Sequence, residues 1–177
     1  VTIFFVLLIL LIPIIVIVSF LGIIITLLSG FAAAVDNTDY ASGSGASIVA
    51  VAVQEIGYHE GAGNHTKYGV YTGTDGMSWC HAFVSWCANE CGFIESNIIP
   101  KTAACETGRQ WFIHKQQYQK AGSYTPQAGD IIYFDKGGVG ESHHVGIVEY
   151  VENGIVHTIE GNKNNQVMRG HYELTYK

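Results

Sequence analysis

The sequence predicts an α+β domain in which helices pack on one face of an antiparallel sheet, preceded by a transmembrane helix. Within the polar part of the chain, helical hydrophobic periodicity comes first, and short apolar runs bounded by turn residues follow it. Helices followed by strands, rather than alternating with them, are typical of α+β proteins. The third observation is an uncharged apolar run at the N-terminus.

Residues 1–30 are predicted to form a transmembrane anchor. Val1–Leu28 contains no charged residue and consists mainly of Ile, Leu, Val and Phe. At about 1.5 Å per residue, such a helix crosses a hydrocarbon core about 30 Å thick. A cleaved signal peptide is the alternative, because Ala32–Ala34 offers small residues for cleavage, but the run exceeds the usual signal core. Since Val1 lies inside the run, we expect further sequence before it.

The charged residues all follow Ala34 and are mostly acidic. There are 9 basic and 15 acidic residues, for a net charge of −6, and no basic cluster that would bind phosphates. We therefore expect no nucleic-acid partner. The first basic residue after the run is Lys67, so the positive-inside rule leaves the C-terminal side free to be exported. The predicted location is the cell membrane, with the domain outside the cell.

The chain after the anchor divides into a linker and one domain. Residues 31–45 are rich in Ser, Gly, Asn and Asp and predict a flexible linker, while residues 46–177 suffice for one hydrophobic core. Ser47 can cap the first helix, and a loop is predicted over 58–76. The expected helices are 48–56, 80–91 and 102–117, and the expected strands are 131–134, 144–151, 155–160 and 166–174.

Cys80 is the candidate nucleophile. It is the first residue of a predicted buried helix that ends at Gly92. The apolar stripe of this helix comprises Cys80, Phe83, Val84, Cys87, Ala88 and Cys91. A cysteine in the first turn of a helix lies at the positive end of the helix dipole, which favours the thiolate. A packing cysteine is the alternative, because free cysteines are commonly buried.

We expect neither a metal nor a cofactor. His59 and His65 are six residues apart in a loop, whereas two ligands on one helical face need the spacing of H-E-x-x-H. The chain has four cysteines, and we expect a disulfide between Cys91 and Cys105 if Cys80 is the nucleophile. A zinc site is the competing hypothesis, although it lacks a C-x-x-C pair; its ligands would be His81, Cys87, Cys91 and Cys105.

A cysteine nucleophile needs a base, and the base needs a group that orients it. His144 starts the second predicted strand and Glu160 ends the third. A three-residue hairpin loop, Glu152–Gly154, with a G1 bulge places Gly146 opposite Glu160 and His144 opposite Asn162. The two-residue turn Asn153–Gly154 would instead put Glu160 on the other face from His144. We predict the three-residue loop.

His144 is the predicted base rather than His143, which would point to the other side of the strand. Either Glu160 or Asn162 can orient the imidazole, and the other would then support it or contact the oxyanion. The alternative for both residues is simple capping of the strand end.

Four motifs together resemble the CHAP family, the cysteine, histidine-dependent amidohydrolases/peptidases. They are Trp79-Cys80-x-Ala82-Phe83-Val84-Ser85-Trp86, Gly129-Asp130-Ile131, His144-Val145-Gly146-Ile147-Val148 and Glu160-Gly161-Asn162. The resemblance covers about residues 46–177 and implies a papain-like, NlpC-type fold. It also implies that Cys80 is the nucleophile, His144 the base, and Glu160 and Asn162 the third and fourth polar residues.

The resemblance implies a cell-wall hydrolase that cleaves amide bonds of peptidoglycan through a thioester, as an endopeptidase or an N-acetylmuramoyl-L-alanine amidase. Some members carry an acidic calcium loop before the cysteine, but Asp75 is the only acid in Thr72–Trp79, so no calcium site is expected. With its anchor, the chain is similar to membrane-bound wall hydrolases of Gram-positive conjugative elements, which implies a conjugative secretion apparatus as partner. A non-catalytic wall-binding or scaffold module and an amide-forming acyl transferase remain as alternatives.

Overall fold

The computed structural model describes residues 45–135, 137–138 and 140–174. The predicted anchor lies outside these residues, as does nearly all of the predicted linker. No helix within the described ranges is long and apolar enough to cross a membrane.

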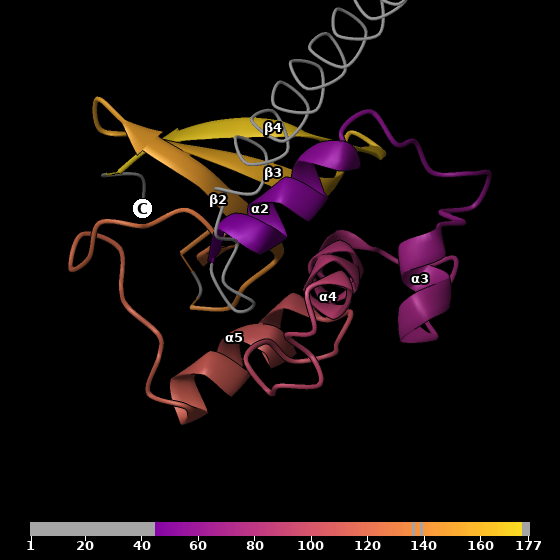
Figure 1. Ribbon diagram of the computed structural model, residues 1–177, viewed down its shortest axis with the longest axis horizontal. Helices are drawn as coiled ribbons and strands as arrows, with labels where there is room; N and C mark the ends of the chain where they lie inside the picture. The colour runs from indigo at the N-terminus through magenta and orange to yellow at the C-terminus, as the bar shows by residue number, and fades with distance from the viewer. Residues whose placement is uncertain (1–44, 136, 139, 175–177) are drawn as a thin grey trace, which may run out of the picture. The chain divides into compact units, whose positions relative to one another are not determined.

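The described residues form a series of helices followed by a four-stranded antiparallel sheet, in the strand order β1-β2-β3-β4 (Figure 1). This arrangement confirms the predicted α+β class. The helices are α2 (Gly45–Gln54), α3 (Lys67–Thr72), α4 (Cys80–Glu90) and α5 (Cys105–His114), and the strands are β1 (Ile131–Phe134), β2 (His144–Glu152), β3 (Ile155–Lys163) and β4 (Gln166–Glu173).

The prediction of a continuous loop over 58–76 is wrong, because α3 lies within it. Thr66 caps this helix by accepting a hydrogen bond from the Gly69 amide, and Gly73 ends it in the left-handed conformation, with φ 76°. A six-residue helix is too short to show a hydrophobic period, so only its caps could have revealed it. Helix α5 is shorter than the expected 102–117, because Ala104 is still extended.

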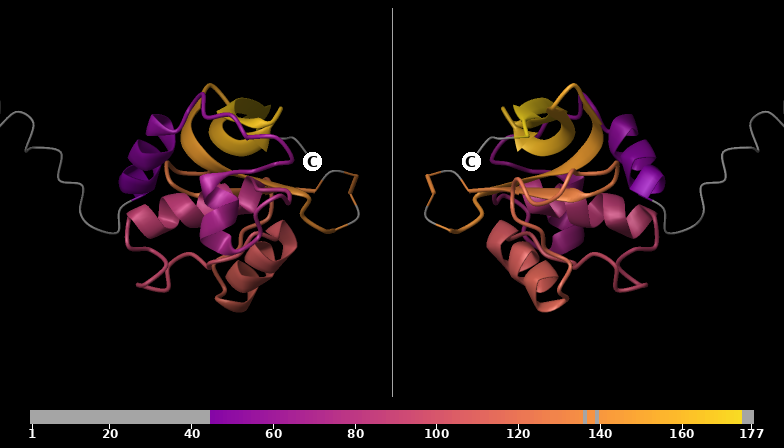
Figure 2. Two further views of the ribbon diagram at one scale, coloured as in Figure 1. Left: turned by 90° about the vertical axis from the view of Figure 1, so that its right-hand side faces the viewer. Right: turned by 90° about the vertical axis from the view of Figure 1, so that its left-hand side faces the viewer.

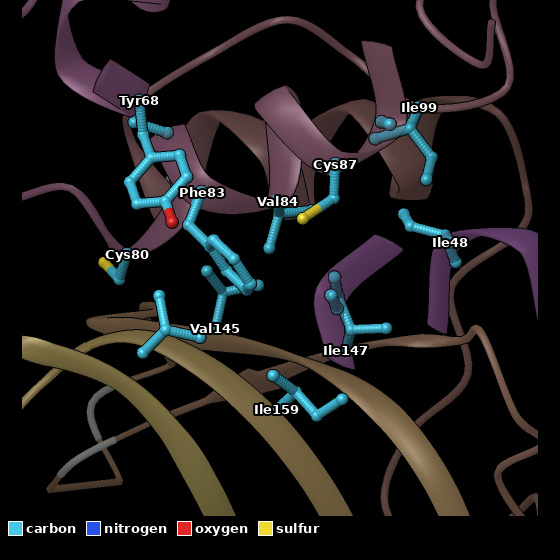
Figure 3. Packing of buried hydrophobic residues seen from close by; sticks show 14 of the residues in the cluster. Ile48, Tyr68, Cys80, Phe83, Val84, Cys87, Ile99, Val145, Ile147 and Ile159 are labelled. Atoms are coloured by element: carbon cyan, nitrogen blue, oxygen red, sulfur yellow. The ribbon is translucent and has the colours of Figure 1, made fainter. Parts of the chain in front are cut away.

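Helix α4 lies against the middle of the sheet and contacts both β2 and β3. Figure 3 shows Val84 and Cys87 on its sheet-facing side, above Val145 and Ile147. Figure 2 shows α4 between the sheet and α5. The close approach depends on Gly161 in β3, because a Cβ there would come within 2.4 Å of the Cβ of Phe83. The start of α4 is therefore held close to the ends of β2 and β3.

The β2–β3 hairpin corrects the predicted loop. Val151 pairs with Val156 and Glu152 with Ile155, so the turn consists of Asn153–Gly154, with both residues at positive φ. This is the two-residue turn that the Asn-Gly dipeptide favours, and the predicted three-residue loop with its G1 bulge is wrong.

A β-bulge inside β2 nevertheless supplies the one-residue shift that was assigned to the loop. The register changes between Val148 and Tyr150, and Ile147 then lies opposite Ile159. As a result, Gly146 does face Glu160: a Cβ on Gly146 would lie 2.9 Å from the Cγ of Glu160. The predicted proximity of Gly146 and Glu160 is therefore confirmed, although the irregularity that produces it lies elsewhere.

The packing of α4 on the sheet predicts a strong effect of Phe83→Ala. Phe83 is fully buried, and its truncation should lower the free energy of unfolding by about 3–5 kcal/mol. Val70→Ala is the control, because Val70 is 58% exposed and its truncation should change the unfolding free energy by less than about 0.5 kcal/mol. Urea unfolding followed by circular dichroism measures both, and equal effects would contradict the described packing.

Candidate active site

Cys80 is the first residue of α4, and Trp79 fixes where the helix begins. The indole Nε1 of Trp79 donates a hydrogen bond of 2.6 Å to Glu60, and its ring stacks on Tyr68 with centroids 5.3 Å apart. The carbonyl of Trp79 accepts the first helical hydrogen bond, from the Phe83 amide at 2.9 Å. Cys80 therefore sits at the positive end of the helix, where a thiolate is favoured.

His144 begins β2, and its imidazole is oriented by Glu160. Its Nε2 lies 2.8 Å from Oε2 of Glu160, and its ring stacks on Phe134 with centroids 5.7 Å apart. Because Nε2 is engaged by the carboxylate, Nδ1 is the nitrogen left to serve as a base.

The Cys80 thiol and the His144 imidazole lie close enough for each to shift the other's pKa. The described side-chain hydrogen bond of the Cys80 thiol goes to Cys105 and not to His144. Loose contacts of this kind between nucleophile and base are common before substrate binds.

The Glu160 carboxylate is fully buried and satisfied on all sides. Besides its bond to His144, it accepts hydrogen bonds from Thr158 Oγ1 at 2.6 Å, from Lys163 Nζ at 3.0 Å and from the Tyr172 hydroxyl at 2.9 Å. Charge-assisted bonds of this kind compensate for the burial of an ionised group.

Two glycines make room for this carboxylate within the sheet. A Cβ on Gly146 would lie 2.9 Å from Cγ of Glu160, and one on Gly170 would lie 2.0 Å from its Oε1. Any other residue at Gly170 would therefore displace the Glu160 side chain that orients His144.

The pKa shifts favour an ion pair between Cys80 and His144. The hydrogen bond from Cys105 lowers the pKa of Cys80 most strongly, burial opposes it, and His144 adds to the lowering, so that the pKa is about 5. Burial alone would lower the pKa of His144, but its interactions with Cys80 and Glu160 outweigh burial and raise the pKa to about 9. Between these two values, the thiolate and the imidazolium coexist.

The Glu160 carboxylate is ionised over the same range. Burial would raise its pKa, but the hydrogen bonds from His144, Thr158 and Lys163 outweigh burial and lower the pKa to about 2. A charged carboxylate therefore faces the imidazolium throughout the range in which the ion pair exists.

The structure brings Cys80, His144 and Glu160 together, and the described contacts of these three side chains do not include Asn162 or His143. Asn162 has a φ of 58° and lies where the β3–β4 register is irregular; the described hydrogen bonds to the His144 ring come from Glu160 and not from Asn162. His143 is exposed. Of the two candidates, Glu160 is thus the one that contacts the imidazole, and the catalytic roles of both residues stay predictions.

Cys105 also lies at this site, whereas the sequence led us to expect it in a disulfide with Cys91 or in a zinc site. Its Sγ lies 3.2 Å from Sγ of Cys80, because α5 begins next to the start of α4. The expected Cys91–Cys105 disulfide is wrong: all four cysteines are free, and Cys91 follows the far end of α4. A sequence signal was present, since each of two successive predicted helices has a cysteine near its start.

Two of the histidines considered as metal ligands, His81 and His65, have other partners. His81 is fully buried, with Nδ1 3.0 Å from the Thr102 carbonyl and Nε2 2.9 Å from the Tyr133 hydroxyl. His65 contacts Asp75, which also accepts a hydrogen bond from the Thr66 amide at 3.0 Å. Within the described part of the chain, no group of three or more His, Cys, Asp or Glu side chains could hold a metal ion.

Comparison with known proteins identifies the family. The family model described as "CHAP domain" matches residues 72–162, a segment that contains Cys80, His144, Glu160 and Asn162. The chain therefore belongs to the CHAP family, whose members are in general cysteine- and histidine-dependent amidohydrolases or peptidases that act on peptidoglycan.

A search of curated proteins finds no match. Among solved structures, one titled "The crystal structure of Ly7917" is similar, with a TM-score of 0.45 and 17% sequence identity over 74% of this chain. The alignment covers 57% of that protein, so this chain spans little more than half of its length.

The pKa of Cys80 predicts reactive-thiol chemistry at mildly acidic pH. Because the pKa of Cys80 is lowered to about 5, its alkylation rate with iodoacetamide should rise as the pH passes about 5. An ordinary cysteine shows this rise at about pH 8.5. Cys91 is the internal control, since burial raises its pKa and it should react only at high pH. Peptide mass spectrometry separates the two sites, and a Cys80 midpoint above pH 8 would contradict the ion pair.

Proposed function

We propose that the protein is a peptidoglycan hydrolase that cleaves an amide bond through a Cys80 thioester, with His144 as acid and base. The observation that carries this proposal is the position of the His144 imidazole, which is held by Glu160 at 2.8 Å beside a thiol of lowered pKa at a helix start. Membership of the CHAP family supports the substrate class.

In the proposed mechanism, the Cys80 thiolate attacks the carbonyl carbon of the amide. The backbone N–H of Cys80, at the start of α4, is one donor for the oxyanion that forms. The tetrahedral intermediate collapses when the His144 imidazolium gives its proton to the leaving amine, and a thioester to Cys80 remains. The neutral imidazole then takes a proton from water, which attacks the thioester and releases the acid and the thiolate.

In this proposal Glu160 is a positioning residue. It holds Nε2 of His144, so that the other ring nitrogen faces the thiol, and its charge stabilises the imidazolium. Asn162 is proposed to support the oxyanion or the substrate, since Glu160 already occupies the position beside the imidazole. The mechanism fits both an endopeptidase and an N-acetylmuramoyl-L-alanine amidase, because each cleaves an amide.

We further infer that the domain acts outside the cell, held at the membrane by residues 1–30, and opens the wall locally for a conjugative secretion apparatus. The support for the location is the uncharged apolar run Val1–Leu28 and the lack of any basic residue between it and Lys67. The conjugative partner is inferred from the resemblance of the anchored chain to membrane-bound wall hydrolases of conjugative elements. Fractionation of cells that express the full chain tests it: the protein should stay with membranes after alkaline extraction and be cleaved by an externally added protease.

Cys80→Ala should abolish wall lysis. The substitution removes the nucleophile, so clearing of purified peptidoglycan in solution and in a zymogram should fall to background, with the circular dichroism spectrum unchanged. Cys91→Ala is the matched control and should lyse like the wild type, because Cys91 lies beyond the other end of α4. Lysis retained by Cys80→Ala would overturn the proposal, and mass spectrometry of the products identifies the bond.

Glu160→Gln should lower the lytic rate by about 10²–10⁴-fold. Because the Glu160 carboxylate raises the pKa of His144, its removal should also move the alkaline limb of the pH–rate profile to lower pH. Glu149→Gln is the control, since Glu149 pairs with Arg169 at 2.7 Å and has no described contact with the site. An unshifted alkaline limb in Glu160→Gln would contradict the role given to this carboxylate.

A further inference from the structure

Two buried thiols meet at the start of α4. The Sγ atoms of Cys80 and Cys105 are 3.2 Å apart, both cysteines are free, and they are 6% and 7% exposed. Each is the first residue of its helix, α4 or α5. The mechanism proposed above needs the first of these thiols and gives the second no chemical step.

The packing of the two helices fixes this approach. One helical turn after Cys105, Gly108 lies directly on His81, the residue after Cys80; a Cβ on Gly108 would come within 2.0 Å of Nε2 of His81 and within 2.6 Å of the Tyr133 hydroxyl. The two helices can therefore approach this closely only because residue 108 has no side chain. Cys80 directly precedes His81, and Cys105 lies one turn before Gly108. The close packing of Gly108 on His81 therefore brings the two thiols together.

We propose that Cys80 and Cys105 form a reversible disulfide and so constitute a thiol–disulfide modification site that switches the nucleophile off. The inhibitory consequence rests on the proposed function of Cys80, whereas formation of the bond does not. A disulfide requires an Sγ–Sγ distance of about 2.05 Å, so the two sulfur atoms need to approach by only about 1 Å.

The oxidant is a low-molecular-weight or protein disulfide. The Cys80 thiolate attacks one sulfur of that disulfide, a mixed disulfide forms on Cys80, and the released thiolate takes up the proton held by His144. Cys105 then attacks Sγ of Cys80, its proton goes to the second thiol that leaves, and the Cys80–Cys105 bond closes. Two electrons pass from the two cysteines to the oxidant, which leaves as two thiols.

The charges at the site give the two cysteines this order of reaction. The interaction with Cys80 is the main cause that raises the pKa of Cys105, and burial adds to it, so Cys105 stays protonated while Cys80 is a thiolate. Once Cys80 carries a mixed disulfide, its negative charge is gone, and Cys105 ionises more easily. Cys80 is therefore the attacking thiol and Cys105 the resolving thiol.

The full chain, incubated with oxidised glutathione, tests this directly. After remaining thiols are blocked, peptide mass spectrometry should find the Cys80–Cys105 cross-link in the wild type and in Cys91→Ala. In Cys105→Ala and Cys105→Ser, the glutathione adduct on Cys80 should accumulate instead, because no resolving thiol is present. Lytic activity of the oxidised wild type should be lost and should recover fully after reduction with dithiothreitol.

A stable glutathione adduct on Cys80 of the wild type, or a cross-link that involves Cys87 or Cys91 instead, would overturn the proposal. The cross-link is read by mass and needs no lysis, so it stands or falls separately from the hydrolase activity. If the cross-link forms but Cys80→Ala still lyses walls, the proposed function fails and the disulfide site remains. If Cys80→Ala is inactive but no cross-link forms, the proposed function stands and the disulfide proposal fails.

Discussion

The buried charge of Glu160 is the constraint on which the structure around the candidate active site depends. A carboxylate with no exposure to solvent is stable only if donors surround it, and here the donors come from β2, β3 and β4: His144, Thr158, Lys163 and Tyr172. Its volume also requires glycine on both neighbouring strands. The sheet is thus built around one charged group, and the orientation of the imidazole follows from that group's need for partners.

How far the sequence predicts this fold depends on whether a feature is encoded locally. Strand β1 was predicted with its observed bounds, and β2 nearly so, because turn residues delimit apolar runs of the right length. The hairpin shows the limit. The Asn-Gly dipeptide correctly favours a two-residue turn. The bulge between Val148 and Tyr150, which brings Gly146 to Glu160, is a feature of the pairing of β2 with β3, and no local signal marks it.

The candidate site divides in the same way. Cys80, His144 and Glu160 stand at the ends of predicted elements, where function concentrates, so sequence and family resemblance together could single them out. The contact between Cys80 and Cys105 is only hinted at by the cysteine near the start of each of two successive helices. How the two helix starts meet depends on tertiary contacts such as that of Gly108 with His81. The same reasoning explains why Glu160 and Asn162 could not be ranked: their order depends on a register irregularity in β3.

The hydrogen bonds that prepare the site extend past the segment that defines the family. The match ends at residue 162, yet Tyr172 donates to Glu160, and Glu60, upstream of the match, fixes Trp79. The segment that includes all these hydrogen bonds is therefore longer than the segment by which the family is recognised. Domain boundaries for expression or fusion should therefore include Glu60 and Tyr172, and also α2, because its Ile48 and Ala52 are fully buried in the core.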